Sequence, residues 1–198
     1  MKVKYILFLV AAGLCLVSYG KDKETKQENK ETKNKEIVYS DHIQDTFFGV
    51  KFGASKKEVI EAFGQHNLYP NGHGTDSWLQ FESRSKYFGF GGFDWEFVNV
   101  NFANDKFYGL DFVYTPENKV TALREFEIVF YALSKKYKMN EIPIQDTNTY
   151  RDYYAISKDG KVMVVSCKKV ESIGGEMRYY VSLFYGDSKL KEEVSDEL

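Results

Sequence analysis

Short apolar segments separated by turn-forming residues fill the middle of the chain. Strand-like patterns occupy residues 78–81, 87–90, 93–102 and 107–114, with Gly91-Gly92 and Asn104-Asp105 between them. Strands at such close spacing are joined by tight turns, and a tight turn reverses the direction of the chain. The sequence therefore predicts an antiparallel meander over this region.

A helix is expected in front of these strands and another one after them. Ser55 and Glu58 have the spacing of a capping box, and the short apolar stripe that follows ends at Gly64. Pro116 opens a second helix, in which large apolar residues recur at steps of three and four up to Tyr137. Both segments therefore have the pattern of amphipathic helices.

Further strands follow the second helix, at 150–156, 162–167 and 178–185. Asp159-Gly160 between the first two is a strong hairpin signal. The order of helix and then strands thus occurs twice, over 47–115 and 116–187. We predict an α+β fold, in which two helix-plus-antiparallel-meander units form a single domain over 37–187 and the helices pack on one face of the sheet.

The ends of the chain differ from this domain. The first twenty residues combine two early lysines, an apolar run over 5–17 and small residues before position 21, which is typical of a secretory signal peptide. Residues 21–36 lack large apolar side chains and predict a disordered, charged tether. Residues 188–198 form a charged tail. We therefore expect export, to the periplasm or the extracellular space.

Cys15 leaves a second alternative for the N-terminus. If this cysteine carries a lipid, the protein is anchored to the outer membrane, and this anchor is the only membrane contact that we expect. If cleavage follows Gly20, the protein is released. The long charged tether favours the anchored form, whereas Leu14 before the cysteine favours release.

Composition narrows the classes of function. The full chain has 27 basic and 29 acidic side chains, and removal of residues 1–20 would leave a formal charge of −4. Because a nucleic-acid surface needs a basic patch, we predict no nucleic-acid partner. Cys167 would be the only cysteine left, which excludes an internal disulfide and a zinc site built from several cysteines.

The residues that carry chemistry do not form a known catalytic or metal-binding motif. Cys167 has no family signature around it, and the spacing of His66, His73 and Asp76 does not match a compact ligand set. We predict no catalytic residue, no metal and no cofactor. The alternative is a small envelope hydrolase, which would need His42, His66 or His73 beside Cys167 or an acid pair.

The segment 93–102 carries apolar residues on both of its faces. Phe93 and Trp95 share one face, whereas Val98 and Val100 share the other. Either a bulge near 97–98 turns both sets toward the core, or the aromatic set is exposed as a binding surface. Candidate residues of that surface, for a protein or glycan ligand, are Trp78, Tyr87, Phe93, Trp95, Tyr108 and the loop residue His73.

The stretch from Phe47 to Ser55 is similar to one found in many exported bacterial proteins. The pattern G-x-S-x-x-E-V-x-x-x-x-G, from Gly53 to Gly64, resembles the helix opening of small exported lipoproteins of the SmpA/OmlA (BamE) family. It also resembles the repeat unit of β-lactamase inhibitor protein. The resemblance implies a non-catalytic protein that binds a partner with its sheet or loops. The predicted function is an exported, non-enzymatic binding protein of the bacterial cell envelope, with carbohydrate binding as an alternative.

Overall fold

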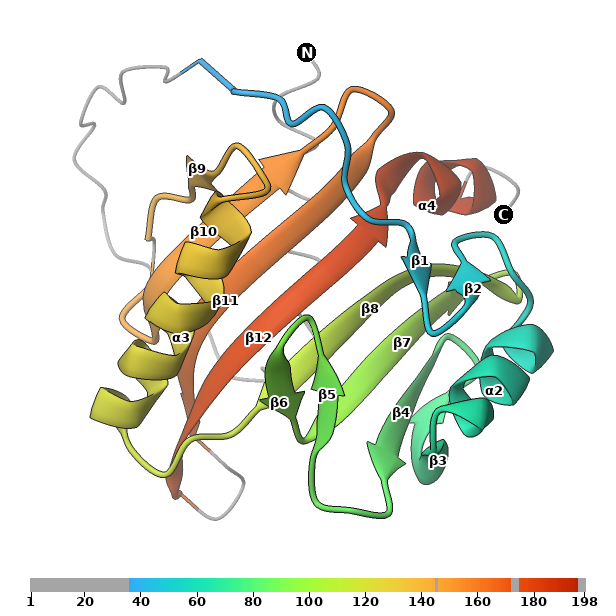
Figure 1. Cartoon of the computed structure of the whole chain (residues 1–198), viewed down its shortest axis with the longest axis horizontal. Coiled ribbons are helices and arrows are strands. Elements are labelled where there is room, and N and C mark those ends of the chain that lie inside the picture. The colour runs from blue at the N-terminus through green and yellow to red at the C-terminus, as the bar shows by residue number, and fades with distance from the viewer. Residues whose placement is uncertain (1–35, 145, 172–174, 196–198) are drawn as a thin grey trace, which may run out of the picture. The chain divides into compact units, whose positions relative to one another are not determined.

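The computed structural model of the chain describes residues 36–144, 146–171 and 175–195 (Figure 1). The predicted signal peptide and all but the last residue of the predicted tether lie outside these residues. The chain from Val38 onward forms one compact unit.

The centre of this unit is an eight-stranded antiparallel sheet. Its spatial order is β3-β4-β7-β8-β12-β11-β10-β9, so that the last strand in sequence, β12, lies between β8 and β11. Pairing of β8 with β12 joins the two runs of strands into one continuous sheet. The strands are β3 (Leu68–Thr75), β4 (Trp78–Ser83), β7 (Phe97–Ala103), β8 (Lys106–Tyr114), β9 (Asn140–Glu141), β10 (Thr149–Ile156), β11 (Lys161–Glu171) and β12 (Met177–Asp187).

Two small hairpins and three helices complete the described part of the chain. The hairpins are β1 (Thr46–Phe47) with β2 (Val50–Lys51), and β5 (Phe88–Phe90) with β6 (Phe93–Trp95). The helices are α2 (Lys56–Gln65), α3 (Lys119–Ser134) and α4 (Ser188–Ser195). Helix α3 and both hairpins lie on the same side of the sheet, in front of it in Figure 1.

Local capping explains where the first two helices begin. The predicted capping box is confirmed, because the Ser55 backbone N–H donates to Glu58 Oε2 at 2.8 Å and the Ser55 side chain accepts from the Glu58 N–H. Helix α3 starts after Asn118, whose Oδ1 accepts from the Thr121 N–H at 3.0 Å. The predicted hairpin at Asp159-Gly160 is also confirmed, since β10 pairs with β11 on either side of it.

The predicted fold class is wrong. The protein is mostly β, with one large antiparallel sheet and short helices of 10, 16 and 8 residues in the described part of the chain, rather than two helix-plus-meander units. Sequence periodicity detects each element, but the β8–β12 pairing that merges the strands joins residues such as Leu110 and Tyr185, which are distant in sequence. Within the predicted charged tail, residues 188–195 form α4.

The predicted strand over 93–102 is divided in the structure. It breaks at Glu96 into β6 and β7, which belong to different sheets. Because of this break, Trp95 and Val98 both reach the core although their spacing would place them on opposite faces of one regular strand. Trp95 is only 1% exposed, so of the two alternatives for this segment it follows the one in which an irregularity turns it toward the core, and its place among the residues of an exposed binding surface is wrong.

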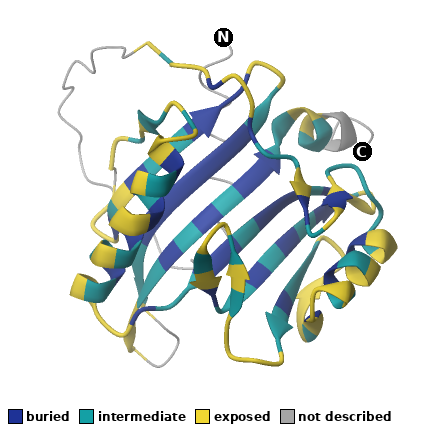
Figure 2. Cartoon of the chain, viewed as in Figure 1, coloured by how far each residue is buried: buried dark blue, intermediate teal, exposed yellow. Residues whose placement is uncertain are grey.

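Aromatic rings fill the core between the sheet and the β5–β6 hairpin. The Phe112 ring on β8 stacks on Phe90 at a centroid distance of 4.1 Å, and Trp95 lies 5.7 Å from the same ring. The Trp95 Nε1–H donates to the Phe90 carbonyl at 3.1 Å, which satisfies the polar atom of this buried indole. Figure 2 shows buried and half-buried positions alternating along much of β12, whereas β11 is buried at six successive residues.

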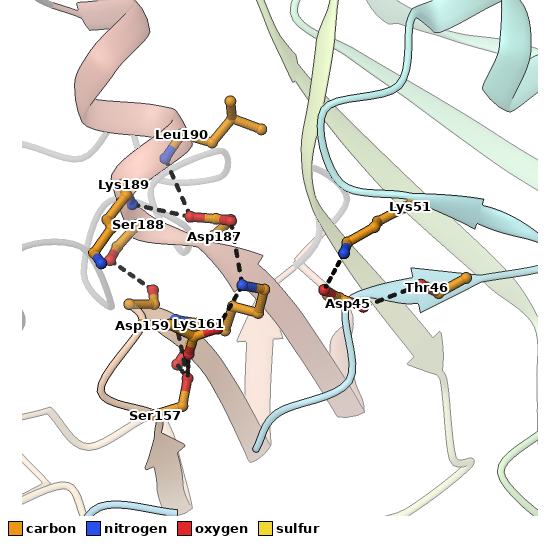
Figure 3. A network of polar contacts seen from close by, with 11 residues as sticks. Asp45, Thr46, Lys51, Ser157, Asp159, Lys161, Asp187, Ser188, Lys189 and Leu190 are labelled. Carbon is orange, nitrogen blue, oxygen red and sulfur yellow. Dashed lines mark hydrogen bonds and ion pairs between the residues drawn. The ribbon is translucent and has the colours of Figure 1, made fainter. Parts of the chain in front are cut away.

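A polar network fixes the end of the β10–β11 hairpin to the start of α4 (Figure 3). The Lys161 ammonium pairs with Asp159 at 2.7 Å and approaches Asp187 at 3.9 Å. The Asp187 carboxylate accepts from the backbone N–H groups of Lys189 and Leu190, both at 3.1 Å. The Lys161–Asp187 contact joins directly paired residues of β11 and β12, and the two backbone contacts of Asp187 cap the start of α4, so the network is structural.

Candidate functional site

The side of the sheet opposite the aromatic core carries the most unusual group of polar residues. We call this side the second face. Residues of β7 alternate between the two sides, with Val98 and Val100 buried in the core and Asn99 and Asn101 on the second face. The strand register then aligns Gln80 of β4, Asn99 of β7 and Asp111 of β8 in one row.

A second polar row continues across the other half of the sheet. It runs through Ser182 of β12, Ser166 of β11 and Asp152 of β10. The Ser166 hydroxyl donates to Asp152 Oδ1 at 2.5 Å, and both residues are buried. Polar groups are thus held on the second face by six neighbouring strands, from β4 to β10.

Burial shifts the pKa values of the charged groups on this face. Burial raises the pKa of Asp111 to about 7, although Lys168 and a hydrogen bond from Ser182 act in the opposite direction. Burial also raises the pKa of Asp152 and lowers the pKa of Lys168. Lys168 lies two residues beyond Ser166 on β11, and it interacts with the carboxylates of Asp152, Asp111 and Asp146.

Two oxygens of the second face lack a hydrogen-bond donor. In the described part of the chain, Asn99 Oδ1 and Asp111 Oδ1 are shielded from solvent and have no partner. An unsatisfied, shielded acceptor lowers the stability of the folded state, and few occur in native proteins. A pair of them on adjacent strands therefore calls for a specific explanation.

Aromatic side chains of the second face lie beside the polar rows. Phe184 of β12 packs over Gly109 and Gly186, where an added Cβ would lie 3.1 Å and 2.7 Å from its ring. These two glycines make room for the ring against the backbone. Trp78 of β4 lies opposite Asn101 and is half-buried. The second face thus combines flat aromatic groups with amide and hydroxyl groups.

The six residues predicted as a ligand surface do not come together. Trp78 lies on the second face, whereas Phe93 and Trp95 lie in the β5–β6 hairpin on the core side. The ring centres of Phe93 and Trp95 are 6.3 Å apart. Tyr87 is 36% exposed and lies 6.3 Å from Tyr114 at the edge of that same side. The predicted residues are therefore divided between the two sides of the sheet.

The remaining two predicted residues lie in different surroundings. Tyr108 is half-buried at the bulge where β8 departs from regular pairing with β7, and Lys191 of α4 lies 5.8 Å from its ring centre. His73 is exposed on the edge strand β3. Neither residue joins the polar rows as a direct neighbour in the strand register.

The hydrolase alternative requires a reactive Cys167 with a histidine beside it. Cys167 is buried on the core side, and burial raises its pKa to about 11, which disfavours the nucleophilic thiolate. His42, His66 and His73 are all exposed. Among the described residues, no group of three or more His, Cys, Asp or Glu side chains is placed to hold a metal ion.

Sequence reasoning missed most of the second face. The alternation of Asn99 and Asn101 with buried valines was visible in the sequence, and Asp111 lies between Leu110 and Phe112 in a strand-like segment. These signals mark polar positions of a strand. They do not show which positions meet, because that depends on the register between strands.

Searches of the chain against family models, curated proteins and solved structures found no match. Within the described ranges, no helix has both the length and the apolar composition that a membrane crossing needs.

Proposed function

We propose that this protein is an exported, non-enzymatic binding protein of the bacterial cell envelope, and that its partner contacts the second face of the sheet. The observation that carries the proposal is the mixed character of this face, where half-buried Trp78 and Phe184 lie among amide and hydroxyl side chains. Aromatic groups with satisfied or satisfiable polar neighbours are common in protein interfaces.

The surroundings of the candidate nucleophile favour binding over catalysis. A thiol with a pKa near 11 is almost fully protonated at neutral pH, so Cys167 would be a poor nucleophile. Ser166 is also unsuited to attack, because it is buried and its hydroxyl donates to Asp152.

Export rests on the signal-like N-terminus and on the resemblance to exported envelope proteins. Mass spectrometry of the mature protein tests this part directly. A free Lys21 amino group would support release, and an acylated Cys15 would support an anchor. An intact Met1 would contradict export.

Photo-crosslinking in the native envelope tests the binding surface. A photoreactive residue at Gln80 or at Asn101 is expected to give an adduct with the same partner, because these positions lie on the second face. Val120 and Tyr131 of α3, which are 79% and 64% exposed, provide matched control positions on the other side. Adducts from the controls alone would contradict the proposal.

Glycan binding is a second candidate, which the surroundings of Trp78 favour. Its indole is half-buried, with Asn101 opposite and Gln80 two residues along the strand, so a ring and two amides meet on one face. A glycan that stacks there should shift the tryptophan fluorescence of the protein and of Trp95→Phe, but not of Trp78→Phe. No shift with any member of a glycan panel would exclude this candidate.

A further inference from the structure

Asn99 and Asp111 lie directly opposite each other on β7 and β8. Residues paired in this way point to the same face and lie within reach of each other's side chains. Each presents a shielded Oδ1 without a donor. A carboxylate and an amide oxygen are both acceptors, so neither can satisfy the other while Asp111 is ionised.

We propose that Asp111 takes up a proton near neutral pH and, in that protonated form, donates it to Asn99 Oδ1, so that the two strands are joined by a proton-dependent hydrogen bond. A protonated carboxyl group has one donor and one free acceptor. The O–H serves Asn99, and the other oxygen remains available to the Ser182 hydroxyl. One proton therefore satisfies both of the unpaired oxygens.

The surroundings of Asp111 favour the neutral carboxyl group. Burial is the largest influence, and it raises the pKa to about 7. On β12 the directly paired residue is the apolar Phe184. The titratable groups on this face and on the helix packed against it are Glu82 on β4, Tyr108 on β8, Tyr180 on β12, Lys168 on β11, Asp152 and Tyr154 on β10, Asp146 before β10, and Lys191 of α4. Only Lys168 among these lowers the pKa of Asp111.

The consequence is a face whose charge changes near neutral pH. The pKa of Asp111 is higher in the folded than in the unfolded chain, so folding is favoured by proton binding. Stability should therefore fall as the pH rises from about 4 to about 7, and it should level off above that range. The same titration adds a negative charge to the second face, which goes beyond the proposed binding function by making that surface pH-sensitive.

The variant Asp111→Asn tests the proposal, because its amide copies the protonated carboxyl group. Its Nδ2 can donate to Asn99, and its Oδ1 can accept from Ser182. The urea midpoint of the natural protein should fall between pH 5 and pH 8, whereas the midpoint of the variant should change less and exceed that of the natural protein at pH 8. Asp94→Asn, at an exposed position of β6, should retain the natural pH dependence. A variant that is less stable at both pH values, or that falls in parallel with the natural protein, would overturn the proposal.

A direct measurement keeps the proposal testable if the variant folds poorly. In protein with 13C-labelled aspartate, the Asp111 carboxyl signal should titrate with a midpoint near 7. A midpoint below about 4 would show an ionised group and overturn the proposal, with the Asn99 amide turned around to donate instead.

Discussion

The two sides of the sheet use the same strands for different purposes. On the core side, β8 presents Phe112 to a cluster of rings that covers it completely. On the second face, the neighbouring residue Asp111 is shielded but has one oxygen without a partner. One side therefore gains stability from buried apolar area, whereas the stability of the other depends on whether its shielded polar groups find partners.

The largest predicted effect is that a substitution on the core side lowers the free energy of unfolding more than the same substitution on the second face. Trp95→Ala should lower the free energy of unfolding by about 3–5 kcal/mol, because it empties a fully buried site and removes the contact with Phe112. Trp78→Ala removes the same side chain from a half-buried site and should have a clearly smaller effect. Urea unfolding of both variants measures the difference, and equal losses would contradict it.

A substitution that crowds the second face should have the next largest effect. In Gly186→Ala, the new methyl group would lie 2.7 Å from the Phe184 ring, and forcing the ring aside should cost about 1–3 kcal/mol. Gly89→Ala in β5 is the matched control, since nothing lies within 4 Å of its added Cβ. If thermal unfolding shows both variants to be equally stable, Phe184 is not held against the backbone as described.

The smallest predicted effect concerns acid stability at the end of the β10–β11 hairpin. Hydrogen bonds from Lys161 and Ser157 lower the pKa of Asp159 to about 2, so its contribution is present above pH 4 and is lost as the pH falls toward 2. Because the carboxylate is half-exposed, Asp159→Asn should remove less than about 1 kcal/mol. Chemical unfolding at pH 3 and pH 6 measures this loss, and an equal loss at both pH values would contradict the assignment.

Asp159 and Asp111 should affect the pH dependence of stability in opposite directions. Asp159 should stabilise the protein when it is ionised, whereas Asp111 should stabilise it when it is protonated. Their pH ranges hardly overlap, so a single pH series on the two asparagine variants separates them.

Local signals in the sequence predicted local structure well. The Ser55–Glu58 capping box and the Asp159-Gly160 turn depend on residues within a few positions of each other, and both are present. The β8–β12 pairing depends on chain segments far apart in sequence, and missing it led to the wrong fold class. The same limit explains Trp95, whose burial depends on how the β5–β6 hairpin folds back over Phe112.

The sequence also predicted part of the candidate site, namely the part that depends on the alternation within one strand. Alternation in the segment 97–103 places Asn99 away from the core, and this follows from the period of a strand. Its meeting with Asp111 and Gln80 needs the register of three strands, which single-residue patterns do not specify.

The most direct test of the account is crosslinking from Gln80 in two matched backgrounds, with the thermal midpoint measured on each. Asn101→Arg places a bulky charge on the second face, and Ile128→Arg places the same charge on the exposed side of α3. The account predicts that Asn101→Arg removes the Gln80 adduct with little change in midpoint, while Ile128→Arg leaves the adduct intact. An adduct that survives Asn101→Arg and disappears in Ile128→Arg would contradict a binding surface on the second face.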